Sequence, residues 1–234
     1  MMKLMKLEWK KNHLSKYFKT TLIATVLIFL ITAFMAKMAQ NQGELMFTNF
    51  NSYMSFVNII IRVVFVIFSA VLLSRLVIDE YKNKTLQVLF TYPVNRKKVI
   101  QSKLMLIMGF CFLSILFSTI VISLLTFMVN PKLELFPQLL ELGDVINTFP
   151  TIITISIMTA CLSLIPLYFG MKKKSSSTTI TWGVIIGLLV NATVSDGAAT
   201  VNMVQLLVIP GILALVGLTI VYFTFRHIES QDIL

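Results

Sequence analysis

Residues 104–129 read LMLIMGFCFLSILFSTIVISLLTFMV, and none of them carries a charge. A helix needs roughly 20 apolar residues to cross a hydrocarbon core about 30 Å thick, so this stretch is long enough to span a membrane. Five further stretches share its apolar character, and they cover 20–36, 57–78, 146–171, 178–195 and 203–225. The sequence therefore predicts an all-α integral membrane protein with six transmembrane helices.

Two of these stretches depart from the pattern. The first ends at Lys37 and is the shortest, so it can span only if the flanking lysines snorkel or the bilayer thins. The second is interrupted by Arg62, a strong charge well inside the predicted span.

Composition indicates the same class of protein. Hydrophobic residues make up 57% of the chain and charged residues 13%, whereas soluble domains contain about 25% charged residues. Six helices and their connectors use up the 234 residues, which leaves little for a soluble catalytic domain. Cys111 and Cys161 lie in apolar runs without zinc-site spacing or a disulfide framework, so we interpret them as small packing residues.

The basic residues lie in alternate gaps between the apolar stretches. Seventeen of the 20 lysines and arginines belong to one set of gaps: 1–19, 75–103, 172–174 and 226. Positive charge near helix ends stays cytoplasmic. We therefore expect a multi-pass protein of the bacterial cell membrane whose termini and loops at 79–103 and 172–177 face the cytosol. Two cytosolic termini require an even number of crossings, and six is even. The net charge of +10 reflects this orientation and does not indicate nucleic-acid binding.

Two segments are predicted to lie along the membrane surface. Residues 1–19 mix lysines with apolar residues and Trp9, which predicts an interfacial helix held by anionic lipid; a disordered basic anchor is the alternative. This segment has no small-residue cleavage site, so we expect it to be retained. Residues 130–145 are too apolar for a solvated loop, and their acids predict a short amphipathic helix on the outer surface.

The cytoplasmic loop at 79–103 is long for a connection between adjacent helices, since about two to eight residues suffice. Leu86, Leu89 and Phe90 fall on one helical face, and Pro93 ends that helix. A short amphipathic helix between charged clusters is suited to contact another protein. A helix resting passively at the lipid interface fits the same composition, and composition alone does not decide between them.

The residues around this loop resemble a known family. Glu80 is followed by Lys84-Thr85-Leu86 and then by the hydrophobic pair Leu89-Phe90. After these come Pro93-Val94, the basic residue Arg96 and Lys103, the lysine that opens the third span. This pattern resembles the permease subunits of ABC-2-type exporters, which more often have Gly where Lys84 stands. The basic N-terminal helix and six predicted spans extend the resemblance over nearly the whole chain.

The resemblance implies a mode of action. The helix formed by Lys84, Thr85, Leu86, Leu89 and Phe90, with Glu80 and Arg96 at its flanks, is expected to couple this chain to a separate ATPase subunit. The glutamate matching Glu80 is expected to join a polar network at the cytosolic end of the bundle. Two permease subunits, identical or paralogous, would form the pathway with two ATPase copies.

No catalytic, metal or cofactor site is predicted in this chain. The predicted spans contain no Asp or Glu, and both histidines, His13 and His227, lie outside them. The chain also lacks the G-x-x-x-x-G-K-[ST] phosphate cradle. We therefore expect ATP and Mg²⁺ to bind on the partner subunit.

Arg62 has two interpretations. If the second helix starts near Val57, Arg62 lies roughly 8 Å below its outer end, from where it can snorkel to the outer headgroups. Alternatively, Arg62 lies at the outer mouth of a transport cavity and faces an external acid or an exiting cargo. In that case Arg62→Leu is expected to impair export and to preserve assembly.

A stripe of small residues marks the fifth apolar stretch. Gly183, Gly187 and Asn191 recur at four-residue intervals on one helical face. Such a stripe allows close helix approach and suits a subunit interface or a cavity wall. Ordinary packing within one bundle fits the spacing equally well.

The leading hypothesis is therefore an ATP-driven export permease. Its Met- and Phe-rich spans (13 Met, 18 Phe in the chain) suit a hydrophobic or amphipathic cargo, and compact relatives of the family export antimicrobial or cytolytic peptides. The alternative is a non-transporting membrane protein that gives immunity, senses or scaffolds by binding a peptide. Only the resemblance favours export over import.

Overall fold

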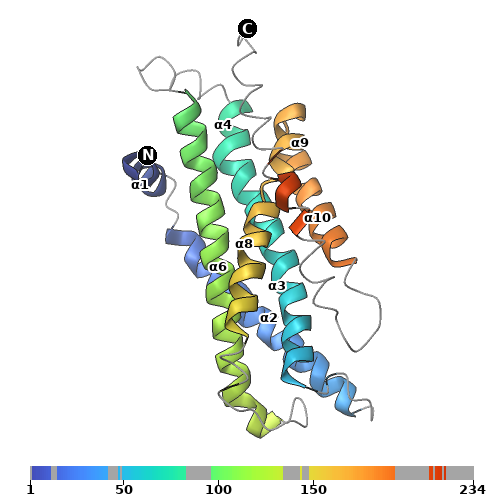
Figure 1. Ribbon diagram of the computed structural model, residues 1–234. Helices are drawn as coiled ribbons and strands as arrows, with labels where there is room; N and C mark the ends of the chain where they lie inside the picture. Colours follow the sequence, from blue (N-terminus) through green and yellow to red (C-terminus); the bar gives the residue numbers. More distant parts are fainter. Residues whose placement is uncertain are drawn as a thin grey trace.

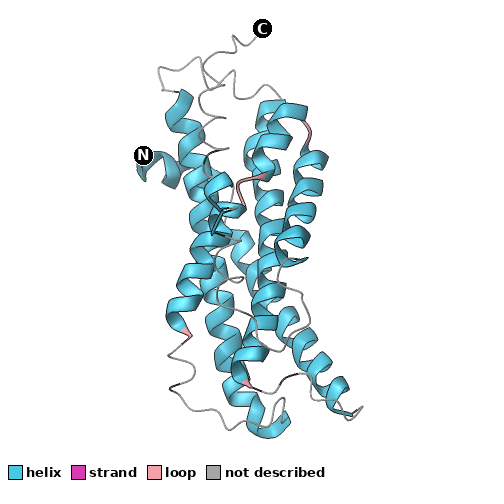
Figure 2. Ribbon diagram, turned by 45° about the vertical axis from the view of Figure 1, so that its right-hand side comes forward, coloured by secondary structure: helices cyan, strands magenta, loops and turns pink. Residues whose placement is uncertain are grey.

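The computed structural model describes residues 2–11, 15–41, 47, 49–82, 96–133, 143, 148–192, 211–212, 214–217 and 219. Within these ranges every regular element is a helix, as the sequence predicts (Figure 1 and Figure 2). Four segments are long and apolar enough to cross a membrane: Lys16–Asn41, Phe50–Ile78, Val99–Pro131 and Phe149–Lys173. A fifth apolar helix, Ser176–Val190, is shorter, and the sixth predicted span at 203–225 lies mostly outside the described residues.

The N-terminal segment forms two helices. Helix α1 covers Met2–Lys11, and α2 covers Ser15–Asn41. The predicted interfacial helix at 1–19 is therefore shorter than expected, because residues 15–19 belong to α2. Figure 1 shows α1 beside α6, with α2 crossing the bundle obliquely.

Helix α2 extends the predicted span 20–36 at both ends. Lysine is a good helix former, so the helix continues past the apolar stretch into the polar interface. At its far end Lys37 donates through Nζ to Gln40 Oε1 at 3.0 Å and to the carbonyl of Leu133 at 3.3 Å. The first membrane helix is thus long enough to span without a thinned bilayer.

The second membrane segment, Phe50–Ile78, continues beyond its end as a helix to Lys82. The whole stretch consists of α3, Phe50–Leu73, a π-helical turn η1, Ser74–Ile78, and α4, Asp79–Lys82. The segment begins seven residues before the predicted span 57–78. Its first turn is closed by Ser52, whose hydroxyl accepts from the Asn49 N–H at 3.3 Å and donates to the Asn49 carbonyl at 2.7 Å.

The remaining helices complete the described bundle. Helix α6 covers Arg96–Leu133, which contains the predicted span 104–129 and the first residues of the predicted surface helix 130–145. The rest of that surface helix, apart from Gly143, lies outside the described residues. The predicted span 146–171 is formed by α8, Phe149–Leu162, and α9, Pro166–Lys173. A turn separates them because Pro166 has no N–H to donate.

Helix α10, Ser176–Ala192, follows a left-handed Lys174 with φ 50°. It takes up most of the predicted span 178–195.

Helix α3 occupies the centre of the bundle and packs against α2, α6, α8, α9 and α10. Its two sides belong to different apolar clusters. Ile61 and Phe65 pack with residues of α2 and α6, whereas Val66 packs with residues of α8 and α10. Helix α2 exposes many large apolar side chains on its outer face: Leu22, Ile23, Val26, Leu27, Leu30, Ile31 and Phe34. An apolar outer surface of this extent is what a lipid-embedded helix requires.

Candidate functional site

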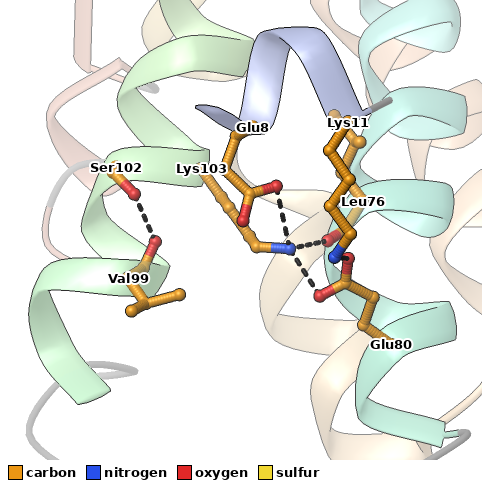
Figure 3. A network of polar contacts seen from close by, with 7 residues as sticks. All are labelled: Glu8, Lys11, Leu76, Glu80, Val99, Ser102 and Lys103. Atoms are coloured by element: carbon orange, nitrogen blue, oxygen red, sulfur yellow. Dashed lines mark hydrogen bonds and ion pairs between the residues drawn. The ribbon is translucent and has the colours of Figure 1, made fainter. Parts of the chain in front are cut away.

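Four charged side chains gather where α1, α4 and the first turns of α6 meet, a region called the α4 end below. Lys103 is at the centre, and its side chain is 2% exposed. Its Nζ lies 2.5 Å from Glu80 Oε2 and 3.4 Å from Glu8 Oε2. It also donates to the carbonyl of Leu76 at 3.1 Å (Figure 3). The buried ammonium therefore donates hydrogen bonds to Leu76 and Glu80 and forms an ion pair with Glu8.

The π-helical turn η1 places one of these acceptors. The N–H of Asp79 bonds to the carbonyl of Ser74, five residues earlier, so the helix is widened at this point. The carbonyl of Leu76 lies inside the turn and accepts from Lys103. Single π turns within α-helices often occur at functional positions, and here the turn supports the ion-pair centre.

The carboxylate of Glu80 is shared between two lysines. Its second oxygen, Oε1, accepts from Lys11 Nζ at 3.0 Å. Burial by itself raises the pKa of Glu80, but hydrogen bonds and charge interactions with Lys103 and Lys11 outweigh burial and hold the pKa below its usual value. Glu80 is therefore ionised at neutral pH. Since Lys11 is 53% exposed, its pair with Glu80 contributes less than that of Lys103.

Helix α1 is docked on the bundle at this site. Glu8 is buried and pairs with Lys103. Beside it, the Trp9 ring lies 6.3 Å from Phe110 of α6 and 5.8 Å from Phe18 of α2, measured between centroids. The helix predicted to lie on the membrane surface thus contacts the protein with both its acid and its tryptophan.

Asp79 connects the same short helix to the opposite side of the bundle. Its Oδ1 accepts a hydrogen bond from the hydroxyl of Ser176, the first residue of α10. The neighbouring residues Asp79 and Glu80 therefore join α4 to α10 on one side and to α1 and α6 on the other. A displacement of α4 would act on all three helices at once.

Of the seven predicted coupling residues, the structure describes two, Glu80 and Arg96. Glu80 lies in a polar network, as the resemblance implies. Arg96 begins α6, and its side chain is not described. The other predicted coupling residues lie outside the described residues: Lys84, Thr85, Leu86, Leu89 and Phe90.

Sequence reasoning missed two members of the network, Glu8 and Lys11, and gave no role to Lys103 beyond its place in the motif. A signal for Glu8 was present, since it is the single acid among the basic residues of 1–19.

The predicted glycine stripe packs against α3. A Cβ atom added at Gly183 would collide with the side chain of Ala70, whereas the Cβ of an alanine at 187 would lie 3.6 Å from the carbonyl oxygen of Val63. The stripe is therefore used for close packing of α10 on α3 inside one chain. Asn191 lies in the last turn of α10, and its side chain is not described.

Arg62 lies deeper than the sequence suggested. Because the helix begins at Phe50 and not near Val57, Arg62 is about 18 Å from the start of α3, and the residue is 2% exposed. The side chain is enclosed by protein, so it does not lie along a lipid-facing surface as snorkelling requires.

The described residues hold no group of three His, Cys, Asp or Glu side chains that could bind a metal ion. The α4 end is a buried ion-pair centre that links α1, η1, α4 and α6.

Comparison with known proteins gives two matches and one negative result. Residues 4–171 match the family described as ABC-2 family transporter protein. The chain is 33% identical over 231 residues to "Uncharacterized protein YcbO" of Bacillus subtilis (strain 168), which covers 99% of this chain and 100% of the relative. No solved structure matches the chain.

Proposed function

The chain belongs to the ABC-2 family of transporter proteins, and on this premise we propose that it is the membrane-spanning permease subunit of an exporter powered by a separate ATPase subunit. The observation that carries the proposal is the ion-pair centre at the α4 end. It lies at the base of the loop in which the coupling helix is predicted, and it joins that base to α1, α6 and, through Asp79, α10.

Coupling would proceed through α4. Closure of two ATPase subunits on ATP would pull the predicted helix at 84–92, and α4 would pass this movement to α3. Helix α3 packs on α10 through small residues, which allow one helix to slide on the other. The result would be a rigid-body tilt of α3 that opens the path between two permease copies.

The proposed cargo is hydrophobic or amphipathic. The described membrane helices pack through apolar clusters, and the polar side chains buried among them are mostly Ser and Thr hydroxyls, which supports a hydrophobic or amphipathic cargo. Antimicrobial and cytolytic peptides are amphipathic molecules of this kind, and export of such peptides would give resistance to them.

Copurification tests the proposal. The full chain, carrying an affinity tag, is expressed with the P-loop ATPase encoded beside it and extracted in a mild detergent. We expect the ATPase to copurify with the wild type and to be lost when Leu86 and Leu89 are both replaced by Asp. Leu133→Asp is the matched control, since Leu133 lies at the other end of α6, away from the cytosol in the proposed orientation.

The same complex should hydrolyse ATP, and members of a peptide panel should stimulate the rate. If the chain retains no ATPase, and no ATPase gene lies beside its own, it works as a peptide-binding immunity, sensor or scaffold protein and the exporter proposal is wrong.

A further inference from the structure

Unsatisfied polar atoms are concentrated in the middle of the bundle. Among the described residues, five buried side-chain atoms have no hydrogen-bond partner, and four of them belong to three residues: Nε and Nη1 of Arg62, Oγ of Ser69 and Oγ of Ser114. Arg62 lies two residues from the midpoint of the segment Phe50–Ile78. A charge at this depth is costly, and such residues usually serve binding or transport.

Arg62 and Ser114 lie at the same depth on facing helices. Helices α3 and α6 run in opposite directions (Figure 1), and the thiol of Cys111 lies 3.9 Å from the carbonyl of Phe65. One turn from this contact, toward the outer end, are Arg62 on α3 and Ser114 on α6. Both side chains are 2% exposed, yet neither satisfies the other's free atoms.

Arg62 also lies at a boundary between apolar clusters. On the surface of α3 it falls between Phe65, which packs with α2 and α6, and Val66, which packs with α8 and α10. Ser69 follows on nearly the same face, two turns further along. Arg62 and Ser69 thus lie on the strip of α3 between two apolar clusters.

Among the residues that the structure describes, no acid lies near Arg62. The six apolar stretches contain no Asp or Glu. The described acids are Glu8, Asp79 and Glu80, all at the α4 end, and Glu80 lies 18 residues along the helix, roughly 27 Å away. In a dimer, the apolar stretches of the second copy would contain no Asp or Glu either. A bound anion would supply the charge that Arg62 lacks among the described residues.

We propose that Arg62, with the Ser114 hydroxyl as a second donor, binds the carboxylate or phosphate group of an anionic amphiphile that this transporter carries. A guanidinium presents parallel N–H donors that match both groups, and the flanking clusters would hold the apolar part. This inference rests on the proposed function and narrows its cargo. In the enclosed conformation described here, α3 must move against its neighbours before ligand can enter.

Binding to the purified full chain tests the inference without any ATPase, so its failure is distinct from failure of the export proposal. The chain is held in dodecyl maltoside, which has no phosphate, and dodecyl phosphate is added at increasing mole fraction. Thermal unfolding reports binding. We expect dodecyl phosphate to raise the melting temperature, and dodecyltrimethylammonium and inorganic phosphate alone to have no such effect.

Variants assign the effect to residues. Arg62→Gln should weaken the apparent affinity for dodecyl phosphate about tenfold or more, since hydrogen bonds to charged groups contribute about 1.5–3 kcal/mol and 1.4 kcal/mol is a factor of ten. Ser114→Ala should weaken it by a smaller factor. Arg75→Gln is the matched control, because Arg75 lies on the same segment, is exposed and already pairs with Tyr17.

Arg62→Met separates a binding role from a structural one. Without ligand, this variant should melt at a higher temperature than the wild type, because it removes a buried, unpaired charge, and it should not respond to dodecyl phosphate. A lower melting temperature for Arg62→Met, or an unchanged response in Arg62→Gln, would show that Arg62 is structural and overturn the inference. Equal protection by inorganic phosphate would overturn the assignment to an amphiphile.

Discussion

The ammonium of Lys103 lies 2.5 Å from the carboxylate of Glu80, although the two residues are 23 positions apart along the chain. The residues between them contain the predicted coupling helix. The ion pair therefore closes the base of that loop and holds the end of one membrane segment against the start of the next. A force on the loop would act on α3 and α6 together. Helix ends joined in this way suit a coupling element better than ends that move independently.

Breaking this pair should destabilise the protein. Lys103→Met leaves Glu80 and Glu8 without their shared buried cation, and removal of one partner of a buried pair costs roughly 3 kcal/mol or more. For a chain of this size we expect the melting temperature in detergent to fall by about 5–10 °C. Lys82→Met, at an exposed lysine on the same short helix α4, is the control and should change the melting temperature little.

The Glu80 carboxylate predicts a pH dependence with a defined sign. Its pKa in the folded protein lies below the usual value for a glutamate, so its contribution to stability is fully present above about pH 5 and is lost as the pH falls through the folded pKa. The difference in melting temperature between wild type and Glu80→Gln should thus be constant from about pH 8 to about pH 5 and shrink below it. A difference that already shrinks between about pH 7 and pH 6 would assign the effect to another group.

The two packed glycines of α10 should respond differently to the same substitution. Gly183→Ala places a methyl group onto Ala70, and overpacking of this kind costs about 1–3 kcal/mol, so the melting temperature should fall. Gly187→Ala places its methyl at ordinary contact distance from Val63 and gains helix propensity, so the variant should be neutral or slightly more stable. Equal effects at both positions would contradict the observed packing of α10 on α3.

The sequence predicted the class of fold because length and apolarity alone determine whether a helix can cross lipid. It did not predict helix ends, since polar residues continue a helix beyond the apolar core, as Asn49 and Ser52 do at the start of α3. The seven-residue error there changed the depth assigned to Arg62 and, with it, the interpretation of that side chain.

The candidate site was predicted only where a motif named its residue. Glu80 was identified by family resemblance, whereas Glu8 was not, because its partner Lys103 lies far along the chain in another helix and no local pattern encodes such a contact. The π turn η1 was not predicted either, and the Lys103 side chain that bonds to the Leu76 carbonyl inside it comes from another helix.

Membrane orientation can be tested at two exposed positions of the same helical segment. Asn51 lies at the start of α3, and Lys82 ends α4. The charge pattern predicts that Asn51 faces outward and Lys82 faces the cytosol. With Cys111 and Cys161 replaced by Ala, a membrane-impermeant maleimide should label Asn51→Cys in intact cells and Lys82→Cys only after the membrane is opened. Labelling of Lys82→Cys in intact cells would place the ion-pair centre on the outer surface, where no ATPase could reach it.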